Sequence, residues 1–179
     1  MTLVVLDLGS NIEREASLVT ALEHLAGHFS LLKASSVYRT VPVGMSNQPD
    51  FFNLALEVET DKSIEDIRAV ATSIEDEMGR NRSGPKFGPR NIDIDIVLFG
   101  DLVDAERRVP HPQALGELFV VAPLAELRPD GCHPGTKEPW REVRATLLDG
   151  RSGQDAGVVK QCDLKDLPLG DKASAALIG

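Results

Sequence analysis

The hydrophobic residues in the first hundred positions change their spacing several times along the chain. Runs of aliphatic residues with the alternation of a strand are followed by segments in which apolar residues recur every three or four positions. This pattern predicts four strands and two helices in the order β-α-β-β-α-β, and therefore an α+β fold, a ferredoxin-like βαββαβ sheet with both helices on one face. The strands are expected at residues 3–9, 29–40, 51–60 and 92–99, and the helices between Asn11 and Gly27 and between Ser63 and Gly79.

Residues that favour helix caps precede both helices. Ser10 or Asn11 is expected to cap the first helix, and Ser63 followed by Asp66 is typical of a capping box before the second. Proline and glycine mark the segment 41–50 as a loop between the second and third strands. The local signals therefore agree with the order of elements that the hydrophobic pattern predicts.

The pattern weakens after residue 100, where we expect C-terminal additions to the sheet. Residues 118–127 are expected to form a helix with Pro123 in its first turn, where proline is tolerated, and residues 138–148 are expected to form another. From Gly150 the chain is rich in glycine, aspartate and lysine without clear periodicity, which is typical of a loosely held tail. The expected organisation is one domain over residues 1–149 and a possibly flexible extension over 150–179.

Two aspartates interrupt the apolar strand near residue 95. Asp93 and Asp95 are two positions apart, so their side chains share one face of the strand, roughly 6.6 Å apart along it, while the neighbouring isoleucines face the core. Unpaired carboxylates at this range repel each other and are costly to desolvate. A divalent cation removes both problems, and Mg²⁺ is the best match because it binds few carboxylates and keeps positions for water and phosphate. The alternative is a half-exposed strand with salt bridges to nearby arginines.

A basic loop directly precedes this strand. It has no acidic residue between Met78 and Ile92, although the chain has a net charge of -9. Arginines bind phosphate oxygens with two parallel hydrogen bonds, so we expect this loop to hold a phosphate chain beside the metal. The alternative is a solvated basic loop without a ligand. The basic residues are Arg80, Arg82, Lys86 and Arg90.

Several other polar and aromatic residues are candidates for ligand contacts. His111 lies between two prolines and could donate to a phosphate oxygen, although a turn histidine without chemical use is the alternative. Two of the rings of Phe51, Phe52 and Phe119 could stack on a flat heterocycle while Asn53 contacts its amide edge; core packing is the alternative for the rings. The other histidines, His24, His28 and His133, are predicted to be surface residues outside any site.

Composition excludes several classes of function. The pI of about 4.9 argues against a large nucleic-acid surface. The two cysteines form no CxxC motif, which favours a reduced, cytoplasmic setting. No apolar stretch approaches the roughly 18 residues of a membrane span, and the chain has no GxxxxGK[ST] phosphate-binding loop. Small molecules, and neither nucleic acid nor membrane, are therefore the expected partners.

Six motifs then occur in a fixed order. They resemble those of the 6-hydroxymethyl-7,8-dihydropterin pyrophosphokinases of folate biosynthesis, and the resemblance covers about residues 3–130. It implies a ferredoxin-like fold and transfer of the β,γ-pyrophosphate of ATP to the pterin hydroxymethyl oxygen, with release of AMP. The motifs are LGSN (8–11), SSVYRT (35–40), QPDFFN (48–53), IEDEMGR (74–80), FGPRNIDIDIVLFG (87–100) and VPHP (109–112).

The resemblance also implies roles for individual residues. Asp93 and Asp95 would hold two Mg²⁺ ions that bridge the ATP phosphates, while Arg80 and Arg90 would steady the transferring group. His111 would contact the triphosphate. Glu75 and Arg82 of the basic loop would contact the nucleotide. The residues that would contact the pterin are Thr40, Pro42, Val43, Gly44, Phe51, Asn53 and Phe119.

The chain departs from the family pattern at several places near the nucleotide. Glu117 stands where many relatives carry an arginine, and an acid beside a triphosphate is unfavourable unless it points away. Thr72 replaces a common glutamine, whereas Phe51 and Phe87 keep a ring where tyrosine and tryptophan are commoner. These departures define the alternative function, a pterin-binding protein of the same fold with weak or lost ATP-dependent turnover.

Overall fold

The computed structural model describes residues 1–42, 47–80, 88–150 and 157–178. Its first elements confirm the predicted order, except that the second predicted strand is divided in two. They are β1 (Thr2–Ser10), α1 (Arg14–Ala26), β2 (Ser30–Ala34), β3 (Val37–Thr40), β4 (Phe51–Thr60), α2 (Ile64–Glu77) and β5 (Asp93–Phe99).

The break between β2 and β3 falls at two serines whose hydroxyl groups replace part of the strand pairing. Ser35 Oγ accepts a hydrogen bond from the Ala55 N–H at 2.9 Å, and Ser36 Oγ donates to the Glu126 carboxylate at 2.7 Å. Serine side chains compete with the backbone for such bonds. The apolar pattern over residues 29–40 continues across the serines, which is why it predicted one strand.

The strands form one antiparallel sheet with β1 and β4 at its centre. The order is β5-β1-β4-β3-β6, and β2 also pairs with β4. In this register Asp7 of β1 lies opposite Asp95 of β5, and Gly9 lies between Asp93 on β5 and Asn53 on β4. The sheet therefore brings residues that are distant in sequence side by side: one row across the strands contains Asp7 and Asp95, and the next row on the same face contains Asn53, Gly9 and Asp93.

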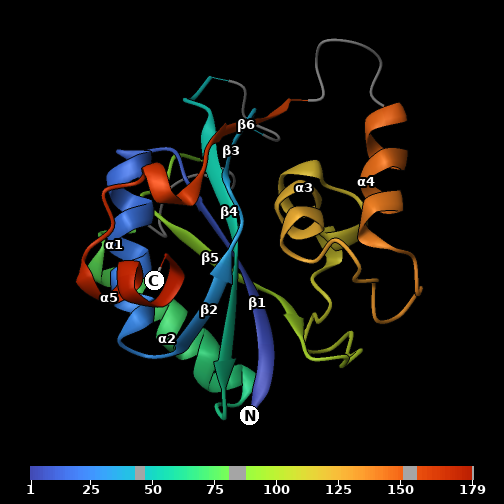
Figure 1. The fold of residues 1–179 in the computed structure, drawn as a ribbon, viewed down its shortest axis with the longest axis horizontal. Helices are drawn as coiled ribbons and strands as arrows, with labels where there is room; N and C mark the ends of the chain where they lie inside the picture. The colour runs from blue at the N-terminus through green and yellow to red at the C-terminus, as the bar shows by residue number, and fades with distance from the viewer. Residues whose placement is uncertain (43–46, 81–87, 151–156, 179) are drawn as a thin grey trace.

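Helices cover both faces of the sheet (Figure 1). Alternate residues of β1 such as Leu6 and Leu8 pack with α1 and α2 in one core, as the amphipathic pattern predicts, whereas Val5 and Val97 pack with later helices in a second core. The helices of the second core are α3 (Leu118–Leu127) and α4 (Trp140–Asp149), preceded by the 3₁₀ turn η1 (Pro112–Leu115). The prediction that the first two helices share one face is thus confirmed. The helices α3 and α4, for which no face was predicted, cover the second face, which is also apolar.

The helix-capping predictions are partly confirmed. Ser63 and Asp66 form the predicted capping box before α2. The residue that precedes α1 is instead Glu13, with a φ of 43°, and its side chain makes no capping hydrogen bond in the described structure. Asn11 is used elsewhere, as shown below, so the prediction that Ser10 or Asn11 caps α1 is wrong.

Pro123 lies in the interior of α3 rather than in its first turn. The helix begins at Leu118, so proline at this position removes one helical hydrogen bond and normally costs stability. The segment stays helical because most of its residues are buried, including Val120, Val121 and Leu124. Tertiary packing therefore overrides the local preference. The α4 helix confirms the second prediction for this region, with Trp140 and Val143 buried.

The C-terminal residues from 157 to 178 belong to the folded structure. The strand β6 (Val158–Cys162) pairs with β3, and after the 3₁₀ turn η2 (Leu164–Asp166) the helix α5 (Asp171–Leu177) places Ala173 in the first core. The expectation of a loosely held tail is therefore wrong for these residues. An exposed edge strand and a seven-residue helix carry too little hydrophobic periodicity to be recognised.

The helices of the described chain are too short or too polar to cross a membrane.

Candidate active site

The sheet face that α3 and α4 cover changes from apolar to polar along the strands. Val5 and Val97 lie in the second core, and the next residues on the same face, Asp7 on β1 and Asp95 on β5, line a cavity of about 560 Å³. Residues two apart on a strand share a face, so one end of this face is core and the other end is a site. A cavity of this size is typical of small-molecule sites.

The aspartate pair of β5 lies on one face of the strand, as predicted, and lines the cavity. Ile92, Ile94 and Ile96 are buried, while Asp93 and Asp95 line the cavity. Desolvation of the Asp95 carboxylate by the surrounding protein and the charge of the nearby Asp93 raise the pKa of Asp95. The charges of His111 and two arginines oppose this shift. The side chain remains accessible from the cavity, so Asp95 is available to a ligand.

Asp93 is paired with two arginines of the basic loop. Arg80 binds Oδ1 at 2.5 Å, and Arg90 binds Oδ2. The alternative interpretation from the sequence, salt bridges between the strand and nearby arginines, is therefore correct for Asp93. It does not exclude a ligand site, since all three residues line the cavity.

Glu75 also contacts Arg80, the arginine that binds Asp93. Its Oε1 accepts a hydrogen bond from Arg80 at 2.5 Å and another from the backbone N–H of Ile94 at 2.9 Å. Glu75 is buried and is not among the described residues that line the cavity. Its carboxylate thus fixes α2 to β5 and orients Arg80, and its predicted contact with a nucleotide remains a prediction.

Asn11, from the LGSN motif, ties three loops together beside the cavity. Its Oδ1 accepts from the Arg90 N–H at 2.9 Å, and its Nδ2 donates to Gln48 Oε1 at 2.9 Å and to Pro49 O at 3.0 Å. The amide therefore holds the arginine-bearing segment against the end of β1. These contacts could not be predicted from local patterns, because they join residues 37 to 79 positions apart.

His111 enters the cavity from the segment after β5. Its backbone N–H donates to Val97 O at 2.9 Å, and its Nδ1 accepts from the Gln113 N–H at 3.3 Å. Burial lowers the pKa of His111, although Asp95 opposes this shift. The ring is therefore neutral at pH 7 with its proton on Nε2, and it can donate one hydrogen bond to an anionic ligand.

The predicted ring-binding residues lie in the same cavity. Phe51 comes from β4 and Phe119 from α3, and Thr40 and Asn53 also line the walls. Thr40 Oγ1 donates to Asn53 Oδ1 at 2.8 Å, which orients the amide. Pro42 is not among the lining residues, but its neighbour Val41 is. Four further predicted residues, Val43, Gly44, Arg82 and Lys86, fall outside the described residues.

Asp7 is a site residue that the sequence interpretation missed. It is 7% exposed, and its pKa is raised well above the usual value by burial and by the charges of Asp95 and Asp93, while hydrogen bonding from Asn53 opposes the shift. The available signal was the same as for β5, a carboxylate inside an aliphatic strand. The other lining residues not predicted are Gly9, Val41, Arg68, Ile94, Ile96, Arg108 and Gln113.

Two other predictions concern residues near this region. Glu117 directly precedes α3 and is not among the described residues that line the cavity. His133, predicted to be a surface residue, is 8% exposed and packs against Trp140 with ring centroids 5.6 Å apart. Its Nδ1 accepts from the N–H groups of Gly135 and Thr136, so its role is to order a turn.

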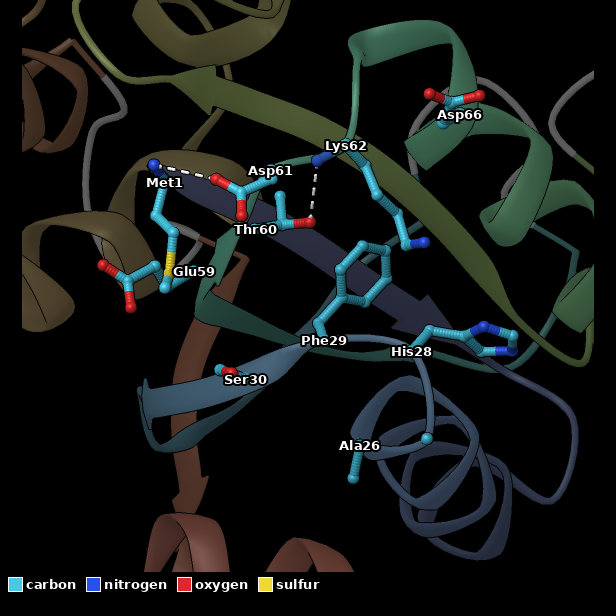
Figure 2. A pocket seen from close by; sticks show the side chains of 11 residues that line it. Met1, Ala26, His28, Phe29, Ser30, Glu59, Thr60, Asp61, Lys62 and Asp66 are labelled. Atoms are coloured by element: carbon cyan, nitrogen blue, oxygen red, sulfur yellow. Dashed lines mark hydrogen bonds and ion pairs between the residues drawn. The ribbon is translucent and has the colours of Figure 1, made fainter.

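A second pocket of about 660 Å³ lies at the other end of β1 (Figure 2). The amino terminus of Met1 forms an ion pair with Asp61 at 2.8 Å there, and Lys62 N–H donates to Thr60 Oγ1. Its walls contain none of the predicted site residues. The cavity beside Asp95 is therefore the stronger candidate, although it is the smaller of the two.

The cavity combines two kinds of binding group. Carboxylates, arginines and a neutral histidine suit a metal-bound phosphate chain, and two aromatic rings with an oriented amide suit a flat heterocycle. Fold and site together define a transferase that acts on a phosphate-containing donor and a ring-bearing acceptor.

Comparisons with known proteins agree with this class. The model of one family, 7,8-dihydro-6-hydroxymethylpterin-pyrophosphokinase (HPPK), matches residues 5–129. A 2-amino-4-hydroxy-6-hydroxymethyldihydropteridine pyrophosphokinase of Bacillus subtilis is 42% identical over 125 residues, 67% of this chain and 74% of that protein. A protein of the same name from Methylorubrum extorquens is 41% identical over 152 residues, 82% of this chain and 94% of the relative.

Solved structures support the fold. The wild-type HPPK-DHPS of Plasmodium falciparum matches with a TM-score of 0.65 at 14% identity, over 83% of this chain and 45% of that longer chain. The chain belongs to the 6-hydroxymethyl-7,8-dihydropterin pyrophosphokinase family, as its motifs predict. The predicted enzyme class, a diphosphotransferase of folate biosynthesis, is confirmed, and the relatives' names support it over a binding protein without turnover.

Proposed function

We propose that the chain transfers the β,γ-pyrophosphate of ATP to the hydroxymethyl oxygen of 6-hydroxymethyl-7,8-dihydropterin and releases AMP. The observation that carries this proposal is the shared cavity: Asp93, Asp95 and His111 line the same walls as Phe51 and Phe119. A donor phosphate and an acceptor ring bound there would be held in reach of each other, which is the main requirement for such a transfer. The strand order is also consistent with the finer, ferredoxin-like assignment.

Asp93 and Asp95 are the residues that would hold Mg²⁺, with two ions expected. Oxygen donors on one face of a strand suit this cation, which binds one or two carboxylates together with substrate phosphates and water. Bound Mg²⁺ would neutralise charge on the triphosphate and lower the proton affinity of the acceptor hydroxyl. The donor set in the cavity therefore fits the metal that the family resemblance implies.

The chain's own residues position the two substrates. Phe51 and Phe119 would enclose the pterin ring, and the Asn53 amide, oriented by Thr40, would bind the polar edge of the ring. His111 would donate from Nε2 to a phosphate oxygen. Held in this way, the acceptor hydroxymethyl group lies toward the carboxylate end of the cavity, and no covalent enzyme intermediate is required.

The arginine pairs of Asp93 imply an exchange of partners when substrates bind. Arg80 and Arg90 occupy both oxygens of this carboxylate. A cation that binds Asp93 must displace at least one arginine, and the displaced guanidinium is then free to bind a phosphate that arrives with the cation. The cation and ATP are therefore expected to bind better together than either does alone.

The Arg90→Ala variant tests this exchange. Without the competing guanidinium, Mg²⁺ alone should bind several-fold more tightly, whereas a non-hydrolysable ATP analogue should bind about tenfold more weakly, because a charge-assisted hydrogen bond is lost. Isothermal titration calorimetry measures both constants. Arg39→Ala, which removes a half-exposed arginine paired with Asp50 at 4.0 Å, is the control. Weaker Mg²⁺ binding in Arg90→Ala would contradict the exchange.

Gly9→Ala tests the placement of the acceptor. A Cβ atom at Gly9 would lie 2.7 Å from Asn53 Nδ2, so the amide must move, and we expect pterin affinity to fall about tenfold, in line with the cost of overpacking a tight site. Affinity for the ATP analogue should change little. Gly116→Ala, where an added Cβ meets nothing within 4 Å, is the matched control. Equal pterin affinity in both variants would argue against this role of Asn53.

The direct test of the proposed function is AMP formation from ATP, with and without 6-hydroxymethyl-7,8-dihydropterin and Mg²⁺. AMP is expected only when all three are present. Tight pterin binding without Mg²⁺-dependent AMP release would favour the alternative, a binding protein of the same fold.

A further inference from the structure

Asp7 presents a buried carboxylate whose polar needs are only partly met: Asn53 hydrogen-bonds to the side chain, but one carboxylate oxygen has no partner among the described residues. The residue lies in the middle of β1, opposite Asp95 across the β1–β5 ladder, and it lines the cavity. Its side chain is 7% exposed, and Oδ1 is buried without a hydrogen-bond partner among the described residues. Such an oxygen normally costs stability, because its lost hydration is not replaced.

A structural role does not account for this carboxylate. A buried carboxylate that stabilises a fold is usually paired with a cation, and the nearby arginines Arg80 and Arg90 bind Asp93 instead. The charged neighbours of Asp7 on β5 are themselves acidic. Three carboxylates therefore lie around one end of the sheet. Among the described residues neither Asp7 nor Asp95 has an ion pair, and Asp7 is the more deeply buried of the two.

The chemistry that satisfies all three carboxylates is a hydrated divalent cation. The described residues contain no group of three acidic, histidine or cysteine side chains placed to hold one ion directly. Direct coordination by Asp7 together with Asp93 and Asp95 is thus not supported. Mg²⁺ retains several of its waters in protein sites, and a carboxylate in the second coordination sphere can accept hydrogen bonds from them.

We propose that Asp7 is an outer carboxylate of the divalent-cation site, which accepts hydrogen bonds from water bound to the ion that Asp93 and Asp95 hold. This inference rests on the proposed function, because that function supplies the cation. Asp7 is a positioning residue: it strengthens ion binding and fixes the bound waters. Its cost in the ligand-free protein is offset only when the ion is present.

The test compares the wild type with Asp7→Asn, which keeps the shape of the side chain and removes its charge. Mn²⁺ serves as the probe, with α,β-methylene-ATP present at saturation, and electron paramagnetic resonance reports free and bound ion. The Mn²⁺ dissociation constant should rise about tenfold, the lower end of the range for lost outer-sphere partners. The melting temperature without metal should rise, since repulsion from Asp95 is removed. Pterin affinity should fall much less than Mn²⁺ affinity, because the Asn53 amide keeps its hydrogen bond from Thr40.

The control is Asp101→Asn, a change at an exposed aspartate two residues after β5, and this variant should match the wild type. Asp7→Ser gives a second neutral replacement in case the asparagine variant does not fold. An unchanged Mn²⁺ constant in the folded variants overturns the proposal, and so does a loss of pterin affinity in place of Mn²⁺ affinity, which would assign the carboxylate to the acceptor. If the wild type itself binds no Mn²⁺ with the nucleotide analogue, the metal part of the proposed function fails, independently of Asp7.

Discussion

Replacement of Asp95 by alanine is expected to lower turnover by about a thousandfold or more while the protein stays folded. The side chain is accessible from the cavity and faces no arginine as closely as Asp93 does, so its predicted use is to bind the cation. A metal ion contributes several kcal/mol of charge stabilisation in a transition state, and each 1.4 kcal/mol corresponds to a factor of ten in rate.

The same substitution should leave the unfolding midpoint of the metal-free protein unchanged or slightly higher. It removes a charge that repels Asp93 and Asp7, and it breaks no ion pair among the residues that the structure describes. AMP formation and thermal unfolding are measured on the same preparation, with Asp101→Ala as the surface control. Near-normal turnover of a folded Asp95→Ala protein would refute the metal role, and a large loss of stability would show that the carboxylate is structural.

The residues of β5 show what the sequence could predict. The alternation of aspartate and isoleucine determines which side chains are buried, and it also places both carboxylates on one face, because both consequences follow from the period of a strand. The order of strands and helices followed from the same kind of local information. The motifs around these elements then predicted the family, which the comparisons confirm.

Features that depend on distant contacts could not be predicted in this way. Asn11 was expected to cap a helix, since asparagine after a strand favours that role locally, but in the structure its amide joins the Arg90 and Pro49 segments. Local helix propensity predicts Pro123 in a first turn because it takes no account of burial. The sequence shows that Asp7 is a polar residue in an apolar strand. That it belongs to the site could be recognised only from the strand register, which sets it opposite Asp95.

Arg80→Ala is expected to have two separable effects, on stability and on turnover. Arg80 connects Glu75 and Asp93, at 2.5 Å from each, and its removal leaves the buried Glu75 carboxylate without this partner. Loss of one member of a buried ion pair costs about 3 kcal/mol of unfolding free energy. Loss of an arginine that steadies a transferring phosphate group lowers turnover by about a thousandfold.

The chain offers a matched control for the stability effect. Arg107 also connects two carboxylates, Glu65 at 2.9 Å and Asp104 at 2.7 Å, but on the exposed surface, so Arg107→Ala should produce no measurable loss. Arg80→Lys separates charge from geometry: it keeps the charge but cannot bind two groups with one planar fork, so it should recover part of the stability and little of the turnover. Urea unfolding and AMP formation measure the two effects. Equal stability of Arg80→Ala and Arg107→Ala would mean that the buried network does not hold α2 to β5, and full turnover in Arg80→Lys would reduce the role of Arg80 to that of a simple positive charge.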